Sequence, residues 1–151
     1  METEKKLAVL SRLARALNGR QAVWAVGASL LLYLKGKAPS FHDIDLMVAE
    51  ADVGKAKEAL LSLGTLQAPK PNAQYKTKHF LEFTIDGVEV DVMAGFCIVK
   101  DGVEHDFPLK KEDIQDAVYV NGELVPLQSL AVWRTYYQLM GRVDKVGMIG
   151  Q

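Results

Sequence analysis

Residues 79–93 form the pattern that most restricts the fold of this 151-residue chain. The sequence HFLEFTIDGVEVDVM contains two runs of alternating apolar and polar side chains, separated by Asp86-Gly87. Alternation is typical of strands with one buried face, and Asp-Gly between two such runs predicts a hairpin with a type I′ turn. This turn fixes the register of the two strands. The expected opposite pairs are Ile85 and Val88, Phe83 and Val90, and Glu82 and Asp91.

The hairpin places its valines on one face and its acidic side chains on the other face. The apolar run VMAGFCIV follows Asp91, so we expect Asp91 to lie well inside the sheet. A carboxylate in such a place needs a partner. The alternative is that this face is exposed to water, which we prefer for Glu82 and Glu89 but not for Asp91.

A second group of acids stands on another expected strand, which runs from Asp43 to Ala49. Residues i and i+2 of a strand point to the same face, so Asp43 and Asp45 should lie side by side. Two like charges this close are unfavourable unless a cation neutralises them, and Mg²⁺ (or Mn²⁺) binds carboxylate oxygens and phosphates. With Asp91 on a neighbouring strand, the three acids would form a metal-binding triad. The alternative is a solvated strand end that carries two acids by chance.

Gly27-Ala28-Ser29 lies between an expected strand, residues 22–26, and a short helix that stops near Gly36. Gly27 would let the backbone turn tightly and let a phosphate approach without a Cβ in the way. Ser29 would lie at the helix start, where free N–H groups favour an anion. From these residues alone we prefer the simpler interpretation, in which Ser29 only caps the helix.

The remaining chain predicts helices at residues 3–18, 52–63 and 127–140, with Ser129 as an N-cap. Phe96 to Val99 should continue the preceding strand, His105 and Asp106 should lie in a connection, and Asn121-Gly122 should form a second I′ turn. The ordered pattern should end at residues 141–145. There Arg142 and Lys145 could reach phosphates, or they could interact favourably with the negative end of the dipole of the preceding helix. We expect the stripe of Leu130, Trp133, Tyr137 and Met140 to be core, and Lys70, Lys76 and Lys78 to be solvated loop residues.

Composition narrows the class of protein. Hydrophobic residues make up 49% and charged residues 25% of the chain, which is ordinary for one globular domain, here residues 1–151. The net charge of −1 gives no general attraction to long nucleic acid or to a membrane surface. Cys97 is the only cysteine, and no apolar run approaches the roughly 18 residues of a membrane span. A cytoplasmic protein is therefore the default expectation.

The Gly-Ala-Ser turn, the Asp-Ile-Asp strand and the later Val-Glu-Val-Asp-Val strand occur in this order within residues 20–145. Together they resemble the DNA polymerase β-like nucleotidyltransferase superfamily, in its small stand-alone form. The resemblance implies an α+β fold with a mixed or antiparallel sheet and helices packed on one face. It also implies transfer of a nucleoside monophosphate from an NTP to a hydroxyl of a small molecule or a protein. Gly27, Ala28 and Ser29, with Arg142 and Lys145, would bind the nucleotide, and Asp43, Asp45 and Asp91 would bind the metal and carry catalysis.

The chain departs from this family pattern in two ways. It has Gly-Ala-Ser where many members have Gly-Gly-Ser, and an alanine fits there only if Ala28 keeps an ordinary φ. We also expect no large second domain, which leaves acceptor recognition unexplained and suggests a homodimer or a partner protein. Two further hypotheses stay open. One is a non-catalytic nucleotide- or protein-binding module, such as a toxin–antitoxin partner, and the other is an interaction protein whose acids face water.

Overall fold

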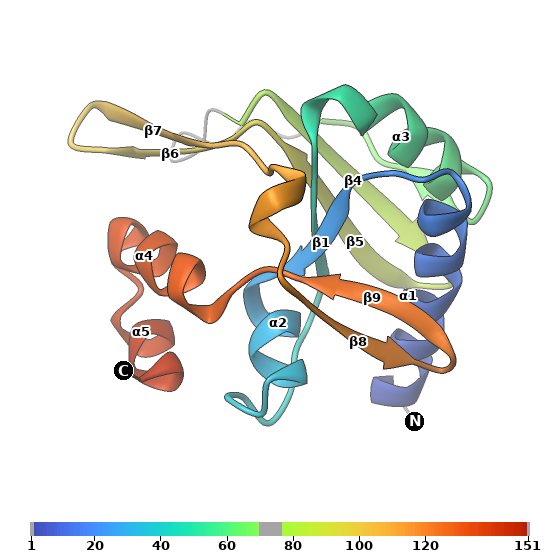
Figure 1. Cartoon of the computed structure of the whole chain (residues 1–151), viewed down its shortest axis with the longest axis horizontal. Coiled ribbons are helices and arrows are strands. Elements are labelled where there is room, and N and C mark those ends of the chain that lie inside the picture. Colours follow the sequence, from blue (N-terminus) through green and yellow to red (C-terminus); the bar gives the residue numbers. More distant parts are fainter. Residues whose placement is uncertain (1, 70–76, 151) are drawn as a thin grey trace.

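A computed structural model describes residues 2–69 and 77–150, and its centre is a seven-stranded mixed sheet (Figure 1). The strand order is β3-β4-β5-β2-β1-β9-β8. The strands are β1 (Trp24–Gly27), β2 (Ile44–Val48), β3 (Thr65–Leu66), β4 (His79–Ile85), β5 (Val88–Ala94), β8 (Asp116–Val120) and β9 (Glu123–Leu127). Two neighbouring pairs, β2 with β5 and β1 with β9, are parallel, and the other pairs are antiparallel. The predicted α+β class with a mixed sheet is confirmed.

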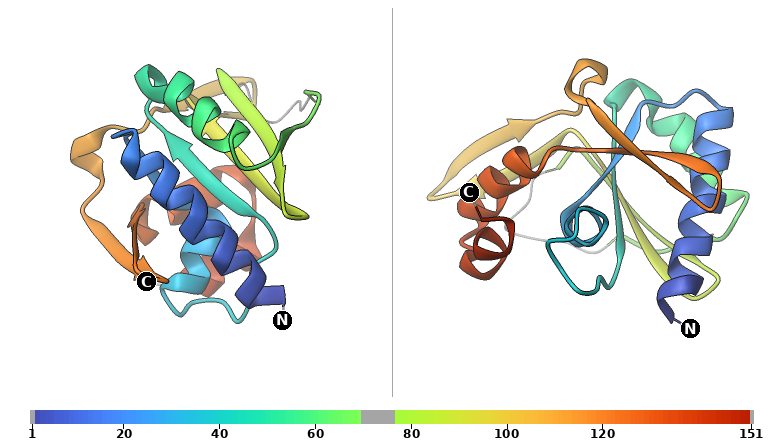
Figure 2. Two further views of the ribbon diagram at one scale, coloured as in Figure 1. Left: turned by 90° about the vertical axis from the view of Figure 1, so that its right-hand side faces the viewer. Right: turned by 60° about the horizontal axis from the view of Figure 1, so that its bottom comes forward.

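Five α-helices surround the sheet in the part of the chain that the structure describes. They are α1 (Glu2–Gly19), α2 (Ala28–Leu34), α3 (Val53–Leu61), α4 (Leu130–Met140) and α5 (Val143–Ile149). Short 3-10 turns, η1 (Glu50–Asp52) and η2 (Lys111–Asp113), complete the helical segments. Helices α1 and α3 lie side by side over one face, whereas α4 and α5 lie on the other side of the sheet, near α2 (Figures 1 and 2).

One part of the core fills the space between the sheet and the helices α1 and α3, and the rest includes buried residues of α2 and α4. The buried side of α1 is made of Val9, Leu10, Leu13, Ala14 and Leu17, at the three- and four-residue spacing of an amphipathic helix. The sheet meets it with buried Ile44, Leu46, Val90 and Val92. None of the helices in the described ranges is long and apolar enough to cross a membrane.

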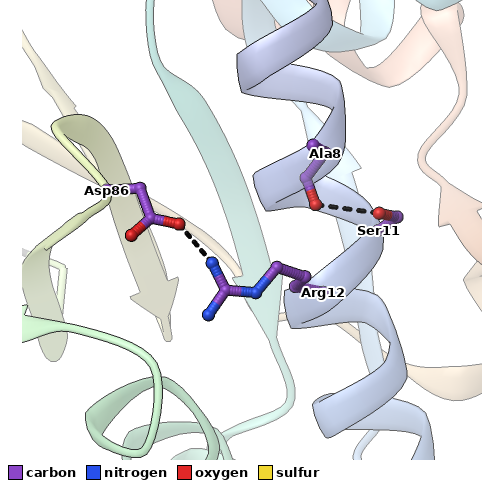
Figure 3. A network of polar contacts seen from close by, with 4 residues as sticks. All are labelled: Ala8, Ser11, Arg12 and Asp86. Carbon is purple, nitrogen blue, oxygen red and sulfur yellow. Dashed lines mark hydrogen bonds and ion pairs between the residues drawn. The ribbon is translucent and has the colours of Figure 1, made fainter.

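The two hairpin predictions are confirmed in their turns and in the predicted register. Asp86 and Gly87 have φ values of 50° and 78°, and Asn121 and Gly122 have φ values of 48° and 83°. Positive φ at both central residues is what a type I′ turn requires. Ile85 pairs with Val88, Phe83 with Val90, and Glu82 with Asp91. The first hairpin is also tied to α1, because Arg12 forms an ion pair with Asp86 (Figure 3).

Three expectations about the second half of the chain are wrong. Gly95 adopts a φ of 64° and ends the strand, so β6 (Phe96–Lys100) leaves the main sheet and pairs with β7 (Val103–Phe107). His105 and Asp106 belong to β7 and not to a connection. Order continues beyond Gly141, whose left-handed conformation ends α4 before α5 begins.

The lysine loop can be judged only in part. Lys70 and Lys76 lie outside the described residues, so their solvated role stays a prediction. Lys78 is exposed and lies 3.4 Å from Glu50.

Candidate active site

The register of two neighbouring strands brings the predicted acids to one face of the sheet. Asp45 of β2 and Asp91 of β5 are direct partners in the parallel pairing, so their side chains share a face. Asp43 directly precedes β2, two residues from Asp45. The alternate residues Ile44, Leu46, Val90 and Val92 fill the core on the opposite face. The same alternation that builds the core therefore gathers the carboxylates on the face away from α1.

A cleft of about 340 Å³ opens over these carboxylates. The sheet supplies its floor, the start of α2 one side, and α4 and α5 another. The residues that line it are Ala28, Ser29, His42, Asp43, Asp45, Phe80, Asp91, Met93, Phe96, Trp133, Tyr137, Met140, Arg142 and Lys145. Every residue predicted from the sequence for catalysis or nucleotide binding lines this cleft, except Gly27.

Asp45 and Asp91 behave as a closely interacting pair. Burial raises the pKa of Asp91 to about 7, and the negative charges of Asp43, Glu82 and Glu89 add to this shift. Burial raises the pKa of Asp45 well above its ordinary value, with further contributions from Asp91 and Asp43. A hydrogen bond between the two carboxyl groups contributes to the raised pKa of Asp45.

Asp43 has a different hydrogen-bond partner from this pair. Burial and the neighbouring Glu89 raise the pKa of Asp43, and a hydrogen bond joins these two carboxyl groups. His42 and Lys6 act in the opposite direction and lower the pKa of Asp43. Asp43 thus interacts with Glu89 in addition to its electrostatic effect on Asp45 and Asp91.

The donor chemistry of these acids suits a divalent cation. In residues 2–69 and 77–150, no three or more histidine, cysteine, aspartate or glutamate side chains are gathered in a geometry that could hold a metal ion. The carboxyl groups of Asp45 and Asp91 are nevertheless hydrogen-bonded neighbours, and their pKa values are raised by burial first and by neighbouring negative charges second. When ionised, carboxylate oxygens are the ligands that Mg²⁺ prefers. The triad with Asp43 stays a prediction.

The Gly27-Ala28-Ser29 turn differs from its sequence-based interpretation. Gly27 has an extended φ of −129°, and a Cβ there would lie 2.6 Å from both Gln128 Oε1 and Trp133 Nε1. Close packing by these side chains therefore demands the glycine. Ala28 has a φ of 54°, so the condition that it keep an ordinary φ is not met. The preferred cap interpretation of Ser29 is also wrong, because α2 has no side-chain cap and Ser29 lies in its first turn, beside the cleft.

The two basic residues come from the start of α5. Arg142 forms an ion pair with Asp144, 3.2 Å from Nη2 to a carboxylate oxygen. Lys145 is near enough to Asp45 for its charge to lower the pKa of that carboxyl. Both side chains line the cleft, so α5 brings positive charge to an acidic floor.

Aromatic and thioether side chains form an apolar wall that sequence reasoning assigned only to the core or missed. Trp133 and Tyr137 are buried as predicted, yet they also line the cleft. Phe80 and Met93 were not recognised as cleft residues. They are register partners on adjacent strands, on the face of Asp91, and the predicted hairpin register contained this signal.

Comparison with known proteins assigns the family. The family model of the aminoglycoside-2''-adenylyltransferases matches residues 9–148, nearly the whole chain. The chain belongs to this family. The assignment agrees with the acidic residues that line the cleft. It makes the protein a polymerase β-like nucleotidyltransferase. No curated protein sequence matches the chain significantly.

Solved structures agree with this fold. TM1012 of Thermotoga maritima, a candidate nucleotidyltransferase, is 25% identical with a TM-score of 0.76, over 96% of this chain and 90% of that one. ANT(2'')-Ia in complex with adenylyl-2''-tobramycin is 11% identical with a TM-score of 0.64, over 96% and 87%. The lincomycin-bound lincosamide adenylyltransferase LnuA is 11% identical with a TM-score of 0.61, over 98% of each chain. The last two show similarity of fold alone.

Proposed function

We propose that this protein transfers the AMP group of ATP to a hydroxyl group of a small-molecule acceptor bound in the cleft. The observation that carries the proposal is the Asp45–Asp91 pair, which the strand register sets at the floor of a cleft in a chain of this family. The family name and the ligands of ANT(2'')-Ia and LnuA support adenylyl transfer and a small acceptor.

The residues that line the cleft would have different roles in phosphate binding and proton transfer. Ser29, Arg142 and Lys145 line the cleft around the acids and would bind the phosphates. The acceptor oxygen attacks the α-phosphorus, the bond from this phosphorus to the bridging oxygen breaks, and pyrophosphate leaves. Asp91 would accept the hydroxyl proton, because its carboxyl group lies at the floor of the cleft beside Asp45.

Asp45 and Asp91, with Asp43, would hold Mg²⁺ or Mn²⁺. When bound, such a cation supplies a positive charge that stabilises the charge developing on the phosphoryl oxygens. The same three side chains are the reason to prefer an enzyme over a non-catalytic binding module. Clustered carboxylates with raised pKa values are costly, and a module that only binds a partner gains nothing from them.

The test is incubation with ATP labelled at the α-phosphate, Mg²⁺, and a panel of aminoglycoside and lincosamide acceptors. We expect labelled acceptor and an equal amount of pyrophosphate, and we expect Asp45→Asn and Asp91→Asn to lower the rate at least about 100-fold. Asp106→Asn is the matched control, since Asp106 is exposed on β7 and does not line the cleft. Transfer that persists in Asp45→Asn and Asp91→Asn would contradict the proposal.

A further inference from the structure

Gln128 is a polar residue that directly follows β9 and is buried with the core, with only 6% of its surface exposed. Its backbone N–H donates to the carbonyl of Val26 at 3.0 Å, which holds it beside β1. Its side-chain Oε1 accepts a hydrogen bond of 2.6 Å from Trp133 Nε1 on α4. Breaking a buried hydrogen bond leaves both polar groups unsatisfied, which costs free energy. This bond therefore holds the two side chains in a fixed position relative to each other.

The bond lies directly against the turn that precedes α2. A Cβ added to Gly27 would lie 2.6 Å from each of its two atoms, Gln128 Oε1 and Trp133 Nε1. The next residue, Ala28, is held at a φ of 54°, an unfavourable conformation that persists only where its surroundings impose it. Trp133 and Gln128 pack on this turn at Gly27.

Trp133 also connects the bond to the other side of the cleft. Its ring packs against Tyr136 and Tyr137 of α4, at centroid distances of 5.0 and 5.3 Å, and against Phe96 of β6 at 6.0 Å. Helix α4 continues through Gly141 into α5, which contributes Arg142 and Lys145 to the cleft. The buried hydrogen bond between Gln128 and Trp133 therefore packs on the turn at Gly27, and through Trp133 it is connected to α4 and α5, where Arg142 and Lys145 line the cleft.

We propose that Gln128 is a positioning residue for the nucleotide, because it holds Trp133 on Gly27 and so sets Ser29 at a fixed place relative to Arg142 and Lys145. The proposal rests on the proposed function, since it requires an NTP in this cleft. Gln128 itself does not line the cleft, so its effect on the nucleotide passes through Trp133.

The experiment is a double-mutant cycle on Gln128→Leu and Trp133→Phe, in which the Kd for ATP with Mg²⁺ is measured by equilibrium dialysis on folded protein. We expect each single variant to bind ATP about tenfold more weakly, and the double variant to bind no more weakly than the weaker single one. Gln138→Leu is the matched control. Gln138 is an exposed glutamine of α4, the helix that carries Trp133, and its replacement should leave the Kd unchanged.

A spectroscopic measurement separates positioning from a general loss of stability. Trp24 is the only other tryptophan, so the Trp133→Phe variant emits from Trp24 alone. Subtraction of its spectrum from that of the wild type gives the emission of Trp133. In Gln128→Leu the indole N–H loses its acceptor, and we expect the Trp133 emission to move to shorter wavelength. In transfer assays, the KM for ATP should rise while kcat changes by less than about threefold.

The outcomes distinguish this proposal from the proposed function. An unchanged Kd in Gln128→Leu, or effects that multiply in the double variant, would overturn the positioning role. If the wild type binds ATP but transfers nothing, the proposed function fails, and the Kd series still decides the role of Gln128. If the wild type binds no ATP, both are overturned.

Discussion

At the scale of single residues, Asp91 has a carboxyl group whose pKa is raised to about 7 by burial and by neighbouring acids. In the unfolded chain its pKa returns to about 3.9. Between these values the folded protein binds a proton that the unfolded chain has lost, so the stabilising contribution is present at low pH and is lost as the pH rises through about 7.

The prediction concerns the free energy of unfolding with a chelator present. From pH 5 to pH 8 the wild type should lose about 1–2 kcal/mol relative to Asp91→Asn, after allowance for solvent screening, because asparagine stays neutral. Urea titrations at both pH values measure this difference, with Asp106→Asn as the control for an exposed aspartate. A wild type that gains stability relative to Asp91→Asn over this range would contradict the pKa assignment.

Ala28 supports a second prediction at this scale. Its φ of 54° costs an L-residue roughly 1–2 kcal/mol, whereas glycine adopts it freely but loses more entropy on folding. We expect Ala28→Gly to raise the free energy of unfolding by about 0.5–1 kcal/mol in urea titrations. Ala131→Gly, an exposed position in α4, should instead lower it by about 1 kcal/mol. The same sign for both variants would argue against strain at Ala28.

Residue types could be predicted from the sequence better than their contacts. The positions of Asp45 and Asp91 on the strand faces could be predicted because strand alternation is a local property. The reason for Gly27 was missed, since it depends on Gln128 and Trp133, about 100 positions further along the chain. The contact of Asp43 with Glu89 was also missed, because it joins the segment before β2 to the start of β5, a strand about 45 positions further along the chain.

At the scale of elements, Lys6 links α1 to the segment that leads into Asp43. Its Nζ donates to the carbonyl of Phe41 at 3.0 Å and lies 5.3 Å from the centroid of the Phe41 ring. That ring packs in turn on Tyr33 of α2, with centroids 5.0 Å apart. The side chain of Lys6 is 12% exposed, so these contacts are shielded from water.

Replacement of Lys6 by methionine should therefore loosen this connection. We expect Lys6→Met to lower the free energy of unfolding by about 1–2 kcal/mol, through the lost hydrogen bond and the lost cation–π contact. Lys5→Met makes the same chemical change at an exposed neighbour and should cost less than about 0.5 kcal/mol. Urea titration of both variants is the measurement, and equal losses would show that the Phe41 contacts contribute nothing.

Elements were predictable where local chemistry specifies them. The Asp86-Gly87 and Asn121-Gly122 turns fixed two hairpins, because only a few dipeptides accept positive φ at both positions. The departure of β6 from the sheet depends on one backbone angle at Gly95, which an apolar run does not reveal. Helix α5 is short and held by tertiary contacts such as the 2.8 Å hydrogen bond from Arg134 Nε to the carbonyl of Gly150.

At the scale of the whole molecule, the cleft forms because the two faces of the sheet are used differently. One face packs on α1 and α3, and the other combines the carboxylates with α2, α4 and α5 (Figure 1). The sequence predicted the acidic floor, but the apolar wall of Phe80, Phe96 and Trp133 arises from segments that meet only in the folded chain. We therefore predict one shared site for nucleotide and divalent cation, built around Asp45 and Asp91.

The unfolding temperature measured with ATP, with Mg²⁺ and with both together tests this claim most directly. For the wild type we expect both ligands together to raise it by more than the sum of their separate effects, since each should strengthen binding of the other. Asp45→Asn should lose this additional rise, and Asp106→Asn should keep it. Stabilisation by ATP that is independent of Mg²⁺ and equal in the wild type and Asp45→Asn would contradict the account.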